Sequence, residues 1–370
     1  MPIAIEPYRK EHEPAVQEFN RRMQAAGDPN LVFYKTATPH WLPKSENKAL
    51  YNEYFVALDG GAVRGAYALK HEQVFVRGQG LLRVGCYHHP LSEGIIDRSY
   101  ASVGGLMVRD ALHRQPLLYA LGMGGMDRPL AKMLKALGWS LALVPFFFRV
   151  IHPARFLNEL HALRTSVART IALNAAAATG LGWLAIRTVQ GLRAGRPRTN
   201  GIAADRVDEF STWADAIWTQ ACEQYSMALV RDYLTLHSLY PVNDKHLTRL
   251  RVRSGSTEIG WAVVGERRKD AKYGAMRVGS IVDCFASPEN AFVVAQAATK
   301  ELEKQRLDLI VSNQSHAAWG DALRRCGFFS GPSNFVFAAS KKYAEALPPF
   351  ENIGTFHTTR ADGDGLPRNF

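Results

Sequence analysis

Residues 131–139, AKMLKALGW, and residues 320–328, GDALRRCGF, share one plan: a short helical pattern that ends at a glycine followed by an aromatic residue. Glycine commonly ends helices because it adopts the left-handed backbone conformation without steric cost. An apolar run precedes each segment, at 117–122 and 307–311, and an aromatic run follows each, at 143–151 and 334–338. Both halves of the chain therefore predict a strand, a helix and a final strand in succession.

Upstream of the first segment, helical and alternating apolar spacings extend this prediction to the N-terminus. Asp59-Gly60-Gly61 is typical of a hairpin turn between two of the strands. The predicted order is strand 3–5, helix 11–26, strands 54–58, 62–70 and 81–87, helix 102–113, strand 117–122, helix 128–137 and strand 143–151.

The second half predicts a similar order, which we interpret as an internal duplication. Strand, helix, glycine and aromatic also recur together by chance in α/β proteins, so the match of the whole order is the stronger argument. The predicted elements are helices 205–221 and 228–237, strands 247–252, 259–264 and 278–285, helix 288–304, strand 307–311, helix 317–325 and strand 334–338.

The predicted fold class is α/β, in the form of α+β domains with a mixed sheet, present as two tandem copies. We expect the first domain at 1–155, a basic, Ala-rich helical linker at 156–204, the second domain at 205–345 and a flexible tail at 346–370. Two domains agree with the length of 370 residues.

The formal net charge is +11, which favours an anionic partner. Between residues 160 and 204 there are six arginines and no acid, and residues 170–186 are almost wholly apolar. We expect a helix packed between the domains, with peripheral membrane contact through 164–198 as the alternative. A membrane span is not expected, because the run is short, Ala-rich and flanked by positive charge on both sides.

Other classes of function find little support in the sequence. The four cysteines form no CxxC pair and no metal-ligand spacing, so we expect free thiols and no metal site. The N-terminus lacks the apolar run of a secretory signal, which favours the cytoplasm. Nucleic-acid binding is not expected, because outside the linker the basic residues form only one short stripe, Arg249, Arg251 and Arg253.

The order of elements, with a last helix ending Leu-Gly-Trp or Cys-Gly-Phe, resembles the GNAT (GCN5-related N-acetyltransferase) superfamily. The tandem form also resembles the Fem-type aminoacyl transferases. Residues 231–241, RDYLTLHSLYP, look like the entry segment of tandem GNAT-like proteins associated with surface-polysaccharide genes. The resemblance covers most of the chain and implies acyl transfer from acetyl-CoA or another acyl-CoA, as co-substrate, to a small-molecule amine or a sugar-linked acceptor.

In that family, backbone N–H groups at the start of the helix after the fourth strand bind the pyrophosphate of the donor, since helix N-termini attract anions. The resemblance places this site at Ser102, Val103, Gly104 and Gly105. Of the family signature Arg/Gln-x-x-Gly-x-Gly/Ala, residues 99–104 match only the last glycine, and residues 287–291 of the second half contain none. We therefore expect the donor site in the first domain.

Arg128 follows the glycine-rich residues 122–125 and is a further candidate ligand for a phosphate. The same stretch also fits a plain turn in which Asp127 caps the next helix. The tyrosine that the family often uses as a general acid is replaced by Leu134 in the first copy and by Leu323 in the second.

The candidate catalytic residues are His88, His89, Glu93 and Asp283. The two histidines follow the predicted fourth strand, and imidazole exchanges protons near neutral pH, as a base for an incoming ammonium must. Glu93 is a second candidate base or a ligand for a cationic acceptor. Asp283 ends the corresponding strand of the second copy. An ordinary polar surface loop is the alternative for the histidines.

Three functions stay open from the sequence. The first is an N-acyltransferase that uses a CoA thioester in the first copy. The second is a Fem-like transferase of cell-envelope or surface-polysaccharide synthesis. The third is a non-catalytic tandem protein that binds an anionic ligand, which the missing tyrosine and glycines favour.

Overall fold

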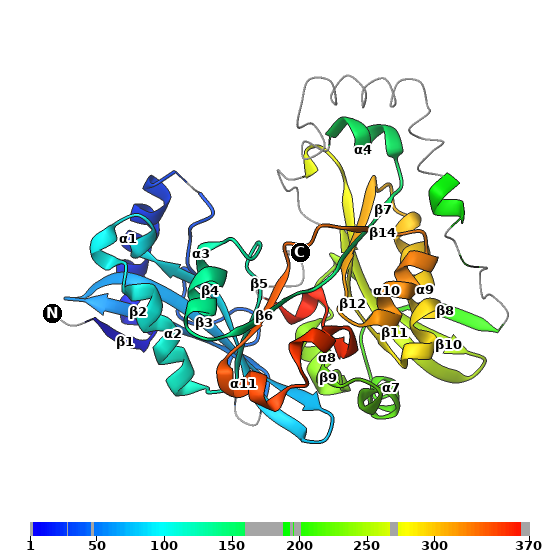
Figure 1. Cartoon of the computed structure of the whole chain (residues 1–370), viewed down its shortest axis with the longest axis horizontal. Coiled ribbons are helices and arrows are strands. Elements are labelled where there is room, and N and C mark those ends of the chain that lie inside the picture. Colours follow the sequence, from blue (N-terminus) through cyan, green and yellow to red (C-terminus); the bar gives the residue numbers. More distant parts are fainter. Residues whose placement is uncertain are drawn as a thin grey trace. The chain divides into compact units, whose positions relative to one another are not determined.

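The computed structural model describes residues 3–27, 29–45, 48–159, 188–192, 195, 201–266 and 273–363 (Figure 1). They form two compact units. The first contains residues up to 142, together with 336–350 and Gly363, and the second contains 143–335 and 351–362. The predicted apolar helix 170–186 lies outside the described residues, as does most of the predicted linker.

The first unit is built on one mixed sheet with the strand order β1-β2-β3-β4-β5-β15-β6. Its strands are β1 (Ala4–Pro7), β2 (Tyr51–Asp59), β3 (Ala62–Val76), β4 (Gly80–Ser92), β5 (Leu118–Gly122), β6 (Ser140–Leu143) and β15 (Val336–Ala339). Its helices are α1 (Glu13–Ala25), α2 (Val103–Arg114), α3 (Pro129–Ala136) and α11 (Lys341–Ala346), with short 3-10 turns η1 (Lys10–His12), η2 (Glu93–Ile95) and η3 (Arg98–Tyr100).

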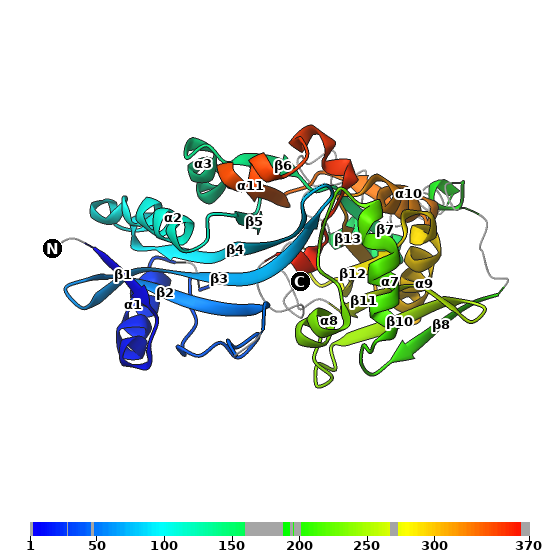
Figure 2. The ribbon, with the colours of Figure 1, turned by 90° about the horizontal axis from the view of Figure 1, so that it is seen from below.

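Alternating side chains give this sheet two apolar faces, because successive residues of a strand point to opposite sides. Phe55, Tyr67 and Tyr87 point to the face that α2 and α3 cover. Tyr54 and Ala68 point to the opposite face, where α1 packs. Figure 2 shows α1 on one side of the sheet and α2 and α3 on the other. We call these the α2 face and the α1 face.

The second unit has a mixed sheet with the strand order β14-β7-β13-β12-β11-β10-β8. The strands of this sheet are β7 (Phe146–Val150), β8 (Ile202–Val207), β10 (Leu247–Ser254), β11 (Thr257–Glu266), β12 (Val278–Ala286), β13 (Leu309–Asn313) and β14 (Phe329–Gly331). The unit also contains β9 (Met227–Leu229) and β16 (Phe356–His357), which pair in parallel outside this sheet. Its helices are α4 (Pro153–Glu159), α7 (Trp213–Ala221), α8 (Tyr233–Leu239), α9 (Ala291–Glu303) and α10 (Ala317–Arg325), with 3-10 turns η5 (Cys222–Gln224), η7 (Pro288–Asn290) and η9 (Arg360–Asp362).

The final strands of the two predicted copies are exchanged between the sheets. The predicted strand 143–151 is interrupted at Pro145, and its second part, β7, pairs antiparallel with β13 in the second unit. The predicted strand 334–338 becomes β15, which pairs antiparallel with β5 in the first unit. Both strands are apolar and aromatic, so periodicity fits either sheet and does not reveal the partner. The units therefore divide the chain differently from the expected boundaries at 155 and 205.

The glycines that end the two motif helices act as predicted. Gly138 and Gly327 have φ values of +81° and +80°. Trp139 N–H donates to the Leu134 carbonyl and Phe328 N–H donates to the Leu323 carbonyl, which is the hydrogen bond of a Schellman motif. Leu134 and Leu323 are buried at this bond, so both leucines serve the packing of the helix end.

Three stretches of the prediction are wrong. Residues 202–207 form strand β8, where a helix was expected from residue 205. Residues 227–229 form strand β9, inside the predicted helix 228–237. The predicted flexible tail contains β16 and η9, whose residues are buried. In each case neighbouring strands or segments satisfy the backbone, and this tertiary pairing overrides the local pattern.

Candidate active site

The parallel strands β4 and β5 separate inside the sheet of the first unit. They share only two register pairs, Gly85 with Leu118 and Cys86 with Tyr119. β4 then continues to Ser92 while β5 ends at Gly122. A gap between the ends of two parallel strands is a place where an extended ligand reaches both backbones and the helix that connects them.

A β-bulge lies in β4 next to this gap. Ala66 pairs with Leu91 and Ala68 pairs with His88, so Tyr67 faces two residues, His89 and Pro90. His89 has φ +49°, a left-handed conformation that non-glycine residues rarely adopt. Bulges re-aim side chains. Here the bulge directs both His88 and His89 toward the α1 face, where His88 meets Asn52 and His89 meets Phe33.

His89 is held in one orientation by its surroundings. Its Nε2 donates to the Val32 carbonyl at 2.7 Å, and its ring stacks on Phe33 at 5.8 Å and lies 5.1 Å from Tyr34. Because Nε2 carries the proton of this bond, Nδ1 of the neutral ring is an acceptor. The half-buried ring is thus held with Nδ1 left as a hydrogen-bond acceptor.

His88 is buried and neutral. Burial lowers its pKa well below the usual range, and the nearby Lys70 and His89 lower the pKa further. Nε2 lies 3.3 Å from Asn52 Oδ1, while Nδ1 is buried without a hydrogen-bond partner. A ring with so low a pKa is a weak base, so His88 fits the role of a neutral hydrogen-bonding group better than that of a proton acceptor.

The predicted anion site lies at the start of α2, the helix that joins β4 to β5. The first intrahelical bond runs from Leu106 N–H to the Ser102 carbonyl, so the N–H groups of Val103, Gly104 and Gly105 precede the helical ladder. A Cβ on Gly105 would have no atom within 4 Å, and one on Gly104 would meet Met133 Sδ at 3.4 Å. Open space beside two glycines at a helix start suits an anion.

Arg128 belongs to the loop that follows β5. It is exposed and forms the N-cap position of α3 without a side-chain hydrogen bond to the helix. The predicted capping of α3 by Asp127 is wrong, because the helix begins one residue later than that role requires. Arg128 Nε lies 3.6 Å from the position of a Cβ on Gly124. The loop contains four consecutive residues with positive φ, Gly122, Met123, Gly124 and Gly125.

The carboxylate of Glu93 forms ion pairs with two arginines. It accepts from Arg22 Nε at 2.7 Å and from Arg64 at 3.1 Å. Burial raises the pKa of Glu93, but the hydrogen bonds and charges of these arginines lower it more, so the net shift is downward. This geometry gives Glu93 a structural role, joining α1 and β3 to the end of β4, and makes it a poor base.

Asp283 is fully buried at the centre of an ion-pair network in the second unit. Its carboxylate accepts from Arg231 Nε at 2.8 Å, from the Tyr240 hydroxyl at 2.6 Å and from the Thr359 hydroxyl at 3.0 Å. Arg231 also pairs with Asp362. With its lone pairs engaged and no exposed surface, Asp283 stabilises the fold and is not placed to meet a substrate.

The second unit has its own pair of separating strands, β12 and β13. Their three register pairs end at Ser280 and Val311. Beyond that point, residues 356–362 bridge the two strands: His357 donates to the Cys284 carbonyl at 2.9 Å, and Thr359 pairs with Gln314 in an isolated bridge. The chain's own segment thus lies across the ends of β12 and β13.

Sequence reasoning missed a buried polar cluster on the α1 face of the first unit. Lys70 pairs with Glu72 at 3.2 Å, and the Tyr119 hydroxyl donates to Glu72 at 2.5 Å. Asn52 completes the cluster beside His88. The only sequence signal was a pair of polar residues in strands that are otherwise apolar, and its meaning depends on the register of three strands.

Among the residues that the structure describes, no group of three or more His, Cys, Asp or Glu side chains is arranged to hold a metal ion. Within the same ranges, every helix is too short or too polar to cross a membrane.

No protein-family model and no curated protein matches the chain. Among solved structures, it is similar to a protein from Enterococcus faecalis V583 described as a probable N-acyltransferase, with a TM-score of 0.51 and 11% identity, covering 91% of this chain and 72% of that one. A GCN5-related N-acetyltransferase from Anabaena variabilis ATCC 29413 gives a TM-score of 0.52 and 9% identity, with the same coverages.

At these identities the likeness concerns the fold alone. It confirms the predicted fold class: the chain forms two mixed α/β sheets in two units, and its fold is similar to that of GNAT-type acetyltransferases. The resemblance to the Fem-type transferases stays a prediction.

Proposed function

We propose that the chain is an N-acyltransferase that moves an acyl group from an acyl-CoA thioester to an amine, with its site in the first unit. The observation that carries the proposal is the contrast between the two pairs of separating strands. β12 and β13 are bridged by residues 356–362, whereas the contacts of the described residues bring no comparable segment between β4 and β5. The second unit then has a structural role.

The donor fits the first unit through its anionic and its extended parts. The pyrophosphate of CoA would accept from the N–H groups at residues 102–105, where Gly105 leaves open space. Arg128 lies on the neighbouring exposed loop and would meet a further phosphate oxygen. The acyl-bearing arm would enter the gap between β4 and β5, which leads to the histidines at the bulge.

The proton of the acceptor ammonium would pass to His89 Nδ1, while Nε2 stays bonded to the Val32 carbonyl. The free amine nitrogen then attacks the thioester carbonyl carbon. A C–N bond forms, the C–S bond breaks, and the leaving CoA thiolate takes up the proton that the nitrogen loses as it becomes an amide. His88, neutral and buried beside His89, supplies a fixed dipole at this point.

The acceptor is a small amine or an amine on a sugar-linked molecule, as the resemblance implies. A Fem-like role in surface-polysaccharide synthesis would use the same gap with a different donor, so the donor is the first property to test.

The test is thermal unfolding of the full chain with acetyl-CoA and longer acyl-CoAs. A donor at 100 times its dissociation constant adds about 2.7 kcal/mol to the free energy of unfolding. Gly105→Leu fills the open space and should remove the stabilisation, while Gly191→Leu, at an exposed glycine in open space, should keep it. Equal stabilisation of both variants would reject the donor site, and no stabilisation of the wild type would reject a CoA donor.

A further inference from the structure

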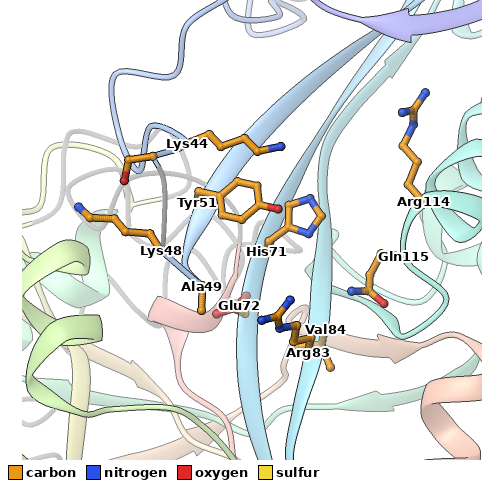
Figure 3. A pocket seen from close by; sticks show the side chains of 11 residues that line it. Lys44, Lys48, Ala49, Tyr51, His71, Glu72, Arg83, Val84, Arg114 and Gln115 are labelled. Atoms are coloured by element: carbon orange, nitrogen blue, oxygen red, sulfur yellow. The ribbon is translucent and has the colours of Figure 1, made fainter.

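A cavity of about 690 Å³ lies in the first unit at the opposite end of α2 from the proposed donor site (Figure 3). It is lined by the loop before β2, by the facing parts of β3 and β4, and by Arg114 and Gln115 at the end of α2. Helices rise 1.5 Å per residue, so the end of α2 is about 16 Å from its start at Val103. The cavity is therefore a separate place from the donor site.

Two of its cations are held in position by carboxylates that leave donors free. Lys44 Nζ bonds Glu53 at 2.7 Å and lies 5.1 Å from the centre of the Tyr51 ring. Arg114 bonds Asp110 through Nε and Nη2, at 2.7 and 3.2 Å. An ammonium has three donors and a guanidinium has five, so both groups have N–H bonds to spare.

Two further cations, Lys48 and Arg83, line the cavity. Among the described residues, neither Lys48 nor Arg83 forms an ion pair with a carboxylate. The carboxylate among the lining residues, Glu72, is only 6% exposed and is engaged by Tyr119 and Lys70. Counted over the described residues, the cavity thus carries an excess of positive charge in a partly enclosed space, which attracts anions.

The neutral groups of the cavity are also mainly donors. Gln115 Oε1 accepts from Leu117 N–H at 3.1 Å, an arrangement that leaves the Nε2 amide group to donate. Tyr51 stacks on His71 with ring centres 4.5 Å apart. Figure 3 shows the two rings next to each other. Burial raises the pKa of Tyr51, so its hydroxyl stays protonated and donates.

We infer that this cavity binds an organic phosphate. The lining offers more hydrogen-bond donors, set further apart, than the two oxygens of one carboxylate can accept. A phosphate presents three acceptor oxygens and up to two negative charges. The volume is in the range of small-molecule sites and exceeds the needs of a bare ion. The Tyr51–His71 stack offers a flat surface to the organic part. The inference is independent of the proposed acyl transfer.

The experiment is isothermal titration of the full chain with inorganic pyrophosphate and with ribose 5-phosphate, using ribose and citrate as comparisons. The variant Lys48→Gln/Arg83→Gln removes two positive charges at exposed positions, so the fold should persist. Lys10→Gln/Lys300→Gln removes the same charge from exposed sites elsewhere. We expect both phosphates to bind the wild type, at least tenfold more weakly to the cavity variant, and within twofold of wild type to the control.

Equal losses in the cavity variant and the control, or no binding of either phosphate, would overturn the inference. If citrate binds as tightly as the phosphates, the cavity is a site for carboxylates and the inference of an organic phosphate is wrong. Because CoA itself carries phosphates, Gly105→Leu is titrated as well. Retained pyrophosphate binding in that variant supports a site separate from the donor site, and lost binding rejects it, whatever becomes of the acyltransferase proposal.

Discussion

The pairs β4/β5 and β12/β13 are the same feature in two units, and the chain uses them differently. In the first unit the strands part after two register pairs, next to a bulge that presents two histidines. In the second, residues 356–362 cross between the strands and bring Asp362 to Arg231. Separated parallel strands leave backbone groups that need hydrogen-bond partners. In the second unit the chain's own segment supplies them, and in the first unit we propose that a ligand does.

The two units also differ in where their charged side chains lie. The Arg231–Asp283–Asp362 network is buried, with each side chain at 1% exposure or less. In the first unit, Lys44, Glu53 and His71 form a chain of contacts at the edge of a cavity. Charges that line a cavity remain available to a ligand, whereas charges that are buried and mutually paired fix the position of a segment.

The largest expected effect is on the buried network. Arg231→Met leaves Asp283 and Asp362 buried without their cation, and we expect a loss of about 3–5 kcal/mol in the free energy of unfolding. Denaturant unfolding measures the loss. The control Arg277→Met breaks an exposed pair with Glu266 and should cost less than about 1 kcal/mol. A loss of similar size in both variants would contradict the anchoring role of Arg231.

The next largest effect concerns His89, the proposed general base in the first unit. If His89 receives the proton of the acceptor, His89→Ala should lower kcat about 100-fold or more, because general base catalysis contributes that much. The KM for the acyl-CoA should change little, since the donor site is at residues 102–105. His113→Ala, an exposed histidine at the end of α2, is the control and should keep full activity. An active His89→Ala enzyme would remove His89 from the mechanism.

The sequence predicted much of this fold and less of the site. The helix ends at Gly138 and Gly327 were predictable, because glycine after a helical pattern is a local signal. The exchange of β7 and β15 was not, since apolar aromatic strands fit either sheet. His88 and His89 became candidates because they follow a predicted strand, and their catalytic role stays a prediction. Their shared direction depends on a bulge, and the engagement of Glu93 by Arg22 and Arg64 depends on contacts between distant segments.

A smaller effect tests the bridging segment itself. Thr359 donates to Asp283 at 3.0 Å, and Thr359→Val removes this donor while nearly preserving the side-chain volume. We expect a loss of about 2 kcal/mol in the free energy of unfolding, because hydrogen bonds to charged groups contribute roughly that amount. Thr248→Val, on a half-buried strand position of the same unit, is the control. An unchanged stability would show that residues 356–362 contribute little to filling the gap.

The smallest effect concerns acid stability in the first unit. The hydrogen bond from His71, followed by that from Lys44, lowers the pKa of Glu53 to about 2. A lowered pKa contributes stability above the unfolded value of about 4.3, and this contribution is lost as the pH falls toward 2. Because Glu53 is partly exposed, solvent screening reduces the contribution to about 1 kcal/mol.

Glu53→Gln should therefore be less stable than the wild type at pH 6, and the difference should shrink by more than half at about pH 3, below the unfolded pKa. Glu11→Gln, which breaks an exposed pair with Arg9, should follow the wild type at both pH values. A difference that stays constant between these pH values would mean that Glu53 titrates alike in the folded and unfolded chains. The ion pairs at the edge of the cavity would then be no stronger than those on an open surface. The difference in strength between them and the buried network of the second unit would be larger than we expect.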